Sequence, residues 1–383
     1  MRKVLVVIGS RANYGSIKSC LKAIQDHNDL SLFLVVGGSA VLEKFGNVSE
    51  NILKDGFKID EKIFFLFEGG DHLSMAKSTG VALIELANSF YRLKPDLVLT
   101  VGDRYETMAT VLAATYLNIP LAHTMGGEVS GTIDESIRHA ITKFASIHFT
   151  ANSDASKRII KMGEFPRYVH NVGCPRIDLV ASSLKEMAKS NKDVEVNGVG
   201  MEIDFKESFL LVSQHPVTTE YSKNRHYMNQ ILEAITDTGL PALILWPNSD
   251  AGSDGISKSI RIWRERYPEA PFKYCKNLDS SIYFYLMNKC KVLIGNSSSG
   301  IREGAFIGTP VVNVGSRQNG RIRSSNVIDV MPKSLEIKNA INYQLQNGKY
   351  ASSNLYGDGN AGAKIAEIIS REKEFQTQKI ISY

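Results

Sequence analysis

The feature that most restricts the fold of this chain is a regular alternation of short, uniformly apolar runs with longer helical patterns. Apolar runs stand at residues 4–8, 32–36, 63–67, 97–101, 121–125 and 147–150. Because these runs do not alternate apolar with polar residues, they are typical of parallel strands that are covered on both faces. Amphipathic patterns, such as residues 73–93 and 105–116, lie between them. The alternation predicts an α/β domain with a doubly wound parallel sheet.

A second series of the same kind follows Gly173-Cys174-Pro175. Its strands are expected at residues 209–212, 242–246, 272–275, 292–294 and 311–314. The polar stretch 190–200 is interpreted as a surface excursion near the domain boundary. We therefore predict an α/β chain of two Rossmann-like doubly wound domains facing a cleft, residues 1–175 and 176–360. The helical pattern at 361–383 could belong to either domain.

Composition and charge exclude several classes of protein. With 43% hydrophobic and 22% charged residues, the chain is suited to packed cores rather than disorder. The formal net charge is only +5, without a basic run, which argues against nucleic acid as a partner. The chain begins with a short strand rather than a signal peptide, and no apolar segment approaches the roughly 20 residues of a membrane span. Its 4 cysteines lie far apart without a CxxC pair. We expect buried free thiols, no membrane partner and a cytoplasmic location.

The loop after the first strand is rich in small residues and reads GSRANYG from Gly9 to Gly15. A glycine-containing turn between strand and helix presents backbone N–H groups to an anion, and Arg11 adds a cation that can bridge a diphosphate. The loop matches neither GxGxxG nor the Walker pattern. Nicotinamide cofactors and P-loop chemistry are therefore disfavoured.

Asp103 follows the expected strand 97–101 in the motif VGDRYE. At the carboxyl end of a parallel strand, an Asp faces the cleft and can act as a base. Asp is also a good N-cap for the helix that follows. The local pattern leaves both interpretations open.

The densest polar segment, HTMGGEVSGTIDESIRH, runs from His123 to His139. Gly126 and Gly127 allow a sharp turn after a strand, which would place Glu128 at the cleft. A carboxylate in that position is suited to proton transfer at carbon.

The same segment continues into the start of a helix that carries four charged or titratable residues. The i,i+4 spacing predicts that Asp134 pairs with Arg138 and Glu135 with His139. Asp134 is a second candidate for proton transfer. The alternative is a solvated charged helix start, where acidic residues are favourable in any case.

Three polar motifs follow strands of the second series, namely VSQHPVTT, WPNSDAG and GNSSSGIRE. Pro216 stops its strand and fixes His215 at the tip, where the imidazole could bind or protonate a phosphate. A capped turn is the alternative role for this histidine. Ser297 and Ser298 can donate hydroxyl and N–H hydrogen bonds to phosphate at the start of a helix.

Two charged residues complete this pattern. Glu303 can accept a bidentate bond from a ribose diol, and Arg317 supplies a further cation for phosphate. Together with Arg11, they predict a nucleotide diphosphate held across the two domains, mostly by the C-terminal one.

In combination, these motifs resemble those of the hydrolysing UDP-N-acetylglucosamine 2-epimerases. The resemblance covers nearly the whole chain, and it rests on SRANYG, VGDRYE, HTMGGEVSGTIDESIRHAITK, HPVTT, PNSDAGS and GNSSSGIREGAFIGTPVVNVGSRQ, in that order. It implies a glycosyltransferase-B-like fold with the C-terminal helix packed back on the first domain. It also implies no nicotinamide, no catalytic metal, and a homodimer or homotetramer.

The family's functional residues carry over onto matching positions of this chain. Its acid/base carboxylates fall on Asp103, Glu128 and Asp134. Its nucleotide contacts fall on Arg11, Arg104, His215, Asn248, Ser297, Ser298, Glu303 and Arg317. One departure is Gly15, where relatives often carry Ser, although Ser16 follows directly.

The resemblance implies conversion of UDP-N-acetylglucosamine and water to N-acetylmannosamine and UDP, for sialic-acid synthesis. The implied mechanism is elimination of UDP to a 2-acetamidoglucal, followed by hydration. A closely similar alternative acts on a nucleotide-linked 2,4-diacetamido-trideoxyhexose of the legionaminic-acid pathway, where the base could be guanine. Two further alternatives are a glycosyltransferase-B-type sugar transferase, against which the acidic cluster stands, and a non-catalytic nucleotide-sugar sensor.

Overall fold

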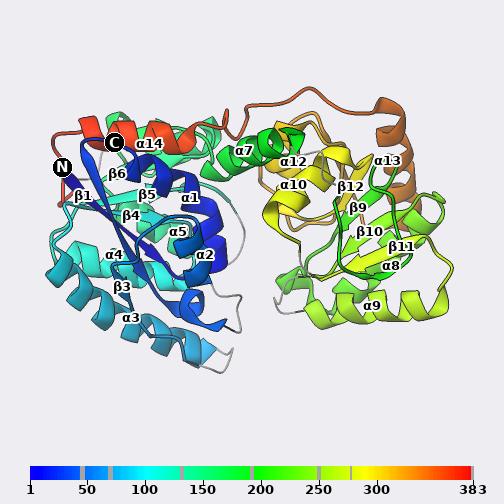
Figure 1. Cartoon of the computed structure of the whole chain (residues 1–383), viewed down its shortest axis with the longest axis horizontal. Helices are drawn as coiled ribbons and strands as arrows, with labels where there is room; N and C mark the ends of the chain where they lie inside the picture. Colours follow the sequence, from blue (N-terminus) through cyan, green and yellow to red (C-terminus); the bar gives the residue numbers. More distant parts are fainter. Residues whose placement is uncertain are drawn as a thin grey trace. The chain divides into compact units, whose positions relative to one another are not determined.

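The chain is seen in a computed structural model that describes residues 1–43, 48–67, 72–129, 133–189, 194–247, 252–276 and 278–380. It divides into two compact units, one of residues 1–179 with 357–383 and one of residues 180–356. In each unit, helices lie on both faces of one sheet (Figure 1). The predicted fold class, two Rossmann-like doubly wound domains, is therefore confirmed.

The first unit is built on a seven-stranded sheet in which every pair of neighbours is parallel. Its strands are β1 (Arg2–Ile8), β2 (Leu30–Val36), β3 (Glu61–Lys62), β4 (Leu97–Val101), β5 (Leu121–Thr124), β6 (Ile147–Thr150) and β7 (Val169–Asn171). Their order is β3-β2-β1-β4-β5-β6-β7, so the chain reverses its direction across the sheet between β1 and β4. In open α/β sheets, ligands bind outside the carboxyl ends of the strands at such a reversal.

Two apolar cores cover the faces of this sheet. The helices of the unit are α1 (Arg11–Gln25), α2 (Val48–Lys54), α3 (His72–Leu93), α4 (Tyr105–Tyr116), α5 (Ile133–Phe144), α6 (Ser153–Lys161), the start of α7 (Pro175–Lys189) and α14 (Ala361–Arg371). One core includes buried residues of α1, α2 and α14, and the other includes buried residues of α3, α4 and α5. Helix α14 packs on α1, where Gly362 lies so close that a Cβ would stand 2.7 Å from the Ser19 backbone.

The second unit repeats the plan with a sheet ordered β14-β13-β12-β9-β10-β11-β8. Its strands are β8 (Val199–Gly200), β9 (Leu210–Ser213), β10 (Ala242–Leu245), β11 (Phe272–Cys275), β12 (Val292–Gly295), β13 (Val311–Val314) and β14 (Val327–Val330). Its helices are α8 (Asn224–Thr236), α9 (Ser253–Arg266), α10 (Ser280–Lys289), α11 (Ser298–Ile301), α12 (Glu303–Ile307) and α13 (Ser334–Asn347). Here the reversal lies between β9 and β12. Among the strands that are described in this sheet, only β8 is antiparallel to its neighbour, β11.

Several expected boundaries are wrong, for physical reasons. We expected a strand at residues 63–67, but β3 consists only of Glu61–Lys62 and ends before this apolar run. Ile63 and Phe65 are buried nevertheless, since they pack over Gly37 and Gly38 where the chain leaves the sheet. The helical pattern expected at 361–383 ends as a helix at Arg371.

All four cysteines are buried and free, as predicted. Within the described residues, every helix is too short or too polar to cross a membrane.

Candidate active site

The loops that follow β1 and β4 bring candidate residues to the reversal point of the first sheet. Ser10 caps α1 by accepting a hydrogen bond from the Asn13 backbone N–H at 3.2 Å, and Arg11 is the exposed first residue of that helix. A Cβ at Gly9 would stand 3.0 Å from the Glu106 Cγ. A side chain at position 9 would therefore crowd Glu106, where the loop after β1 packs against the first turn of α4.

Arg104, and not Asp103, occupies the N-cap position of α4, and its side chain makes no capping bond. The Arg104 Nε donates to the buried Glu106 carboxylate at 2.5 Å. Burial alone would lower the pKa of Arg104, but attraction to Glu106, and more weakly to Asp134, raises it. Arg104 is thus a firmly held cation, and Asp103 is left for another role.

Asp103 is bound by Arg138, which comes from α5 and is only 2% exposed. The Arg138 Nε donates to the Asp103 Oδ2 at 2.8 Å, and its Nη2 donates to the same oxygen. The Arg138 Nη1 donates to the backbone carbonyl of Glu128 at 2.7 Å. One guanidinium therefore ties together the two loops that carry these candidate acid/base residues. The predicted partner of Arg138, Asp134, lies half-buried in the first turn of the same helix.

The loop that carries Glu128 is shaped by glycine. Gly127 has φ of +75°, and a Cβ there would stand 2.4 Å from the Ala155 carbonyl oxygen. Arg158 donates to the Gly127 carbonyl, which further fixes the turn. The turn expected at Gly126 and Gly127 is present, and Glu128, which follows it, is 7% exposed.

His123, which begins this segment, has a supporting role that the sequence did not indicate. It is fully buried, and burial lowers its pKa to about 3, so the imidazole is neutral. Its Nε2 lies 3.0 Å from the carbonyl oxygen of Gly102, so the neutral ring donates from this nitrogen. This bond holds the backbone next to Asp103. The predicted pair of Glu135 and His139 is present, with 3.4 Å between Oε1 and Nε2.

In the second unit, Asn296 organises the reversal point between β9 and β12. Its fully buried side chain accepts from the His215 backbone N–H at 2.7 Å and donates to the His215 carbonyl at 2.9 Å. The Asn296 backbone carbonyl accepts from Arg317 Nη1 at 3.2 Å and from Gln318 Nε2 at 2.8 Å. The structure thus brings together His215 and Arg317, which lie far apart in the sequence.

The serine motif forms a chain of hydroxyl groups beside Asn296. Ser297 Oγ lies 2.8 Å from Ser299 Oγ, which in turn lies 2.6 Å from the Tyr283 hydroxyl. Burial raises the pKa of Tyr283 to about 12, so this hydroxyl remains protonated and able to donate. Ser298 Oγ accepts from Arg302 at 3.3 Å.

Glu303 and Asn248 are the other two predicted nucleotide contacts. Glu303 begins α12 and is 1% exposed, with its Oε2 3.9 Å from the Arg302 Nε. Asn248 lies outside the described residues. Within the part of the chain that is described, no three His, Cys, Asp or Glu side chains gather as metal ligands would.

The supporting residues Arg138, His123, Asn296 and Glu106 were not predicted as site residues. All four lie inside or beside the motifs quoted above. This proximity was the only indication in the sequence that they belong to the site. Their contacts, however, are tertiary and cannot be read from spacing.

The fold and the positions of these residues define a two-domain α/β protein of the glycosyltransferase-B-like class. Among solved structures, the UDP-GlcNAc 2-epimerase of Methanocaldococcus jannaschii in complex with UDP-GlcNAc and UDP is similar, with a TM-score of 0.78 and 17% identity. The match covers 97% of this chain and 100% of that one. The sequence model of the UDP-N-acetylglucosamine 2-epimerase family matches residues 22–370, and the chain belongs to this family.

Two further relatives are more similar in sequence than that solved structure. The UDP-N,N'-diacetylbacillosamine 2-epimerase (hydrolyzing) of Legionella pneumophila is 36% identical, over 96% of each chain. The GDP/UDP-N,N'-diacetylbacillosamine 2-epimerase (hydrolyzing) of Campylobacter jejuni is 34% identical, over 86% of this chain and 84% of that one. The resemblance expected from the motifs is thereby confirmed at the level of the family.

Proposed function

We propose that the protein is a hydrolysing 2-epimerase, which converts a UDP-linked 2-acetamido sugar and water to the free 2-epimer and UDP. The observation that carries this proposal is the buried Arg138, which joins Asp103 to the backbone of Glu128. Proton transfer at carbon needs carboxylates held in fixed positions, and a buried guanidinium supplies that order. The names of both relatives, which include hydrolysis, support the same chemistry.

The reaction consists of an elimination and a hydration. A carboxylate removes the proton from sugar C2 while the bond between C1 and the diphosphate oxygen breaks, giving a 2-acetamidoglucal and UDP. Water then supplies a hydroxyl group to C1, and a proton returns to the opposite face of C2. We assign this proton transfer to Asp103, Glu128 and Asp134.

The departing diphosphate must be stabilised, because the C2 proton is only weakly acidic. We assign this role to Arg11, Arg104, Arg317 and His215. Asn296 holds the backbone of His215 and accepts from Arg317, which supports a joint role of the two side chains. We further assign phosphate to Ser297 and Ser298, ribose to Glu303, and a nucleotide contact to Asn248. The hydroxyl chain from Ser297 through Ser299 to Tyr283 supports the assignment of Ser297 to phosphate.

For the sugar, we favour UDP-N,N'-diacetylbacillosamine, because both relatives at 36% and 34% identity carry this substrate in their names. This sugar is a 2,4-diacetamido-trideoxyhexose, the alternative substrate that the motifs left open. UDP-N-acetylglucosamine, with N-acetylmannosamine as product, is the second candidate and is supported by the family that matches the chain. The GDP-linked diacetylbacillosamine is a third substrate to test, since the Campylobacter relative is named for both nucleotides.

The test measures release of free sugar and nucleotide from each of these substrates, without an acceptor. The variants Asp103→Asn, Glu128→Gln and His215→Ala are expected to fold and to lose on the order of 100-fold or more in kcat. Glu50→Gln, an exposed carboxylate of the first unit, is the matched control and should keep full activity. Normal turnover in all three variants would refute the site, and transfer only to an added acceptor would refute the reaction.

A further inference from the structure

The last stretch of the described chain binds to the end of the helix that carries Arg138. After α14 ends, residues 372–380 continue over the first unit without regular secondary structure. The Arg2 guanidinium stands 4.9 Å from the centre of the Phe375 ring and donates to the Ile369 carbonyl. Ser146, just beyond α5, donates to the Gln376 carbonyl. The segment is therefore attached at several points before it reaches Lys379.

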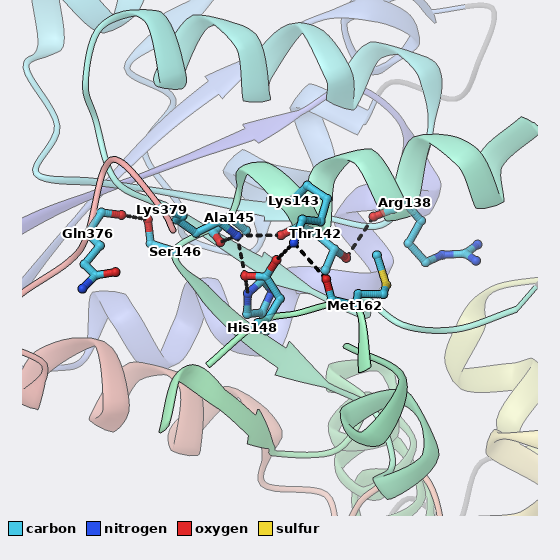
Figure 2. Close-up of polar contacts among 10 residues, drawn as sticks. Arg138, Thr142, Lys143, Ala145, Ser146, His148, Met162, Gln376 and Lys379 are labelled. Atoms are coloured by element: carbon cyan, nitrogen blue, oxygen red, sulfur yellow. Dashed lines mark hydrogen bonds and ion pairs between the residues drawn. The ribbon is translucent and has the colours of Figure 1, made fainter. Parts of the chain in front are cut away.

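Lys379 caps the C-terminal end of α5 (Figure 2). Its Nζ donates to the carbonyl of Ala145 at 2.6 Å and to the carbonyl of Thr142 at 3.1 Å. The last carbonyls of a helix have no partner within the helix, and the negative end of its dipole favours a cation there. Lys379 thus satisfies orphan acceptors at this end of α5.

The same ammonium group donates to Glu164, which is 4% exposed and accepts two further bonds. Lys143 Nζ donates to this carboxylate at 2.6 Å, and His148 Nε2 lies 3.2 Å from it. Burial alone would raise the pKa of Glu164, but these hydrogen bonds from His148, Lys143 and Lys379 lower it to about 2. These donors therefore compensate the buried carboxylate of Glu164, and the cluster is an anchor that holds the segment to the first unit.

This anchor lies one helical turn from the candidate active site. Thr142, whose carbonyl accepts from Lys379, donates its own hydroxyl to the Arg138 carbonyl at 3.0 Å, as Figure 2 shows. Four residues of α-helix span only about 6 Å. Arg138 in turn binds Asp103 and the backbone of Glu128. A shift of α5 along its axis would move this guanidinium and both loops.

We propose that Lys379 is a positioning residue of the reaction, which fixes the end of α5 and thereby the guanidinium of Arg138. The proposal rests on the proposed function for its kinetic readout. A misplacement of about 1 Å in a catalytic arrangement can cost up to about 100-fold in rate, so a small loosening of α5 is measurable.

The variant Lys379→Met, in the full chain, removes the charge and keeps most of the stem. Lys143 and His148 remain on Glu164, so the buried carboxylate keeps partners and the unit should fold. We expect kcat to fall on the order of tenfold, with a much smaller change in the Kd for UDP, because most of the assigned nucleotide contacts belong to the second unit. Lys379→Arg should restore most of the rate. Lys373→Met, an exposed lysine of the same segment, is the control and should behave as the wild type.

Hydrogen exchange tests the anchor at the end of α5 without any substrate. A failure of this proposal can therefore be distinguished from a failure of the proposed function. Amides in the last turn of α5 should exchange faster in Lys379→Met than in Lys373→Met. Equal exchange and equal kcat in those two variants would overturn the proposal. If Lys379→Met fails to fold, Ser146→Ala is the second variant, because it removes the hydrogen bond to the Gln376 carbonyl in the same segment. We expect this variant to lower kcat by a smaller factor. An unchanged kcat in Ser146→Ala would also overturn the proposal.

Discussion

Replacement of Arg138 by Met tests whether one buried guanidinium organises the candidate active site. The side chain is 3% exposed and makes charged hydrogen bonds to Asp103 and to the Glu128 carbonyl. Removal of one partner from a fully buried pair costs roughly 3–5 kcal/mol. The Asp103 side chain is 27% exposed and can be rehydrated, so we expect a smaller loss than this, roughly 2–4 kcal/mol of unfolding free energy. Because the free energy of unfolding of a domain is roughly 5–15 kcal/mol, the first unit should stay folded in buffer.

The assay is urea unfolding followed by far-ultraviolet circular dichroism. Both tryptophans, Trp246 and Trp263, belong to the second unit, so their fluorescence reports separately on that unit. Arg167→Met is the matched control, since that side chain is 66% exposed and lies 3.9 Å from Glu372. Exposed substitutions of this kind usually change stability by less than about 0.5 kcal/mol. If Arg138→Met lowers the free energy of unfolding no more than Arg167→Met does, the buried bond between Arg138 and Asp103 does not stabilise the first unit.

Two further predictions concern the turn before Glu128 and the buried carboxylate cluster. Gly127→Ala should destabilise the first unit by at least about 2 kcal/mol and reduce kcat, because of its positive φ and the Ala155 carbonyl at 2.4 Å. Gly80→Ala, a helix position with open space, should instead be stabilising in urea by roughly 0.5–1 kcal/mol; equal effects would contradict the steric argument. The pKa of Glu164 is lowered from 4.5 to about 2, so its stabilisation is complete above pH 4.5 and is lost as pH falls towards 2. The advantage of the wild type over Glu164→Gln should therefore shrink by roughly 2 kcal/mol between pH 5 and pH 3, and a constant difference in urea titrations would refute this linkage.

Uniformly apolar strands were predictable because their residues alone indicate burial on both faces. The strands at 97–101, 147–150, 272–275 and 311–314 have the expected bounds. Three short strands at the edges of the sheets were missed, namely β7, β8 and β14. β14 reads VIDV and is partly exposed, and β8 has only two residues, so neither carries the apolar signal of a central strand.

The candidate site was predictable as motifs but not as contacts. Asp103 was left open as a base or an N-cap, and Arg104 in fact holds the capping position. Helical spacing predicts only Asp134 as a partner of Arg138, and it cannot predict Asp103, which lies 35 residues away and accepts from the same guanidinium. Such long-range bonds depend on which strands become neighbours, here β4 and β5, and no local pattern contains that information.

The most direct test of elimination and hydration at C2 follows the reaction by NMR in deuterated water, with UDP-N,N'-diacetylbacillosamine and UDP-N-acetylglucosamine in separate samples. A carboxylate that removes the C2 proton exchanges it with solvent before the glucal is hydrated. We predict release of UDP together with a free sugar that carries one deuterium at C2 and the inverted configuration there. A released sugar that keeps its original hydrogen or its original configuration at C2 would contradict elimination and hydration by these carboxylates.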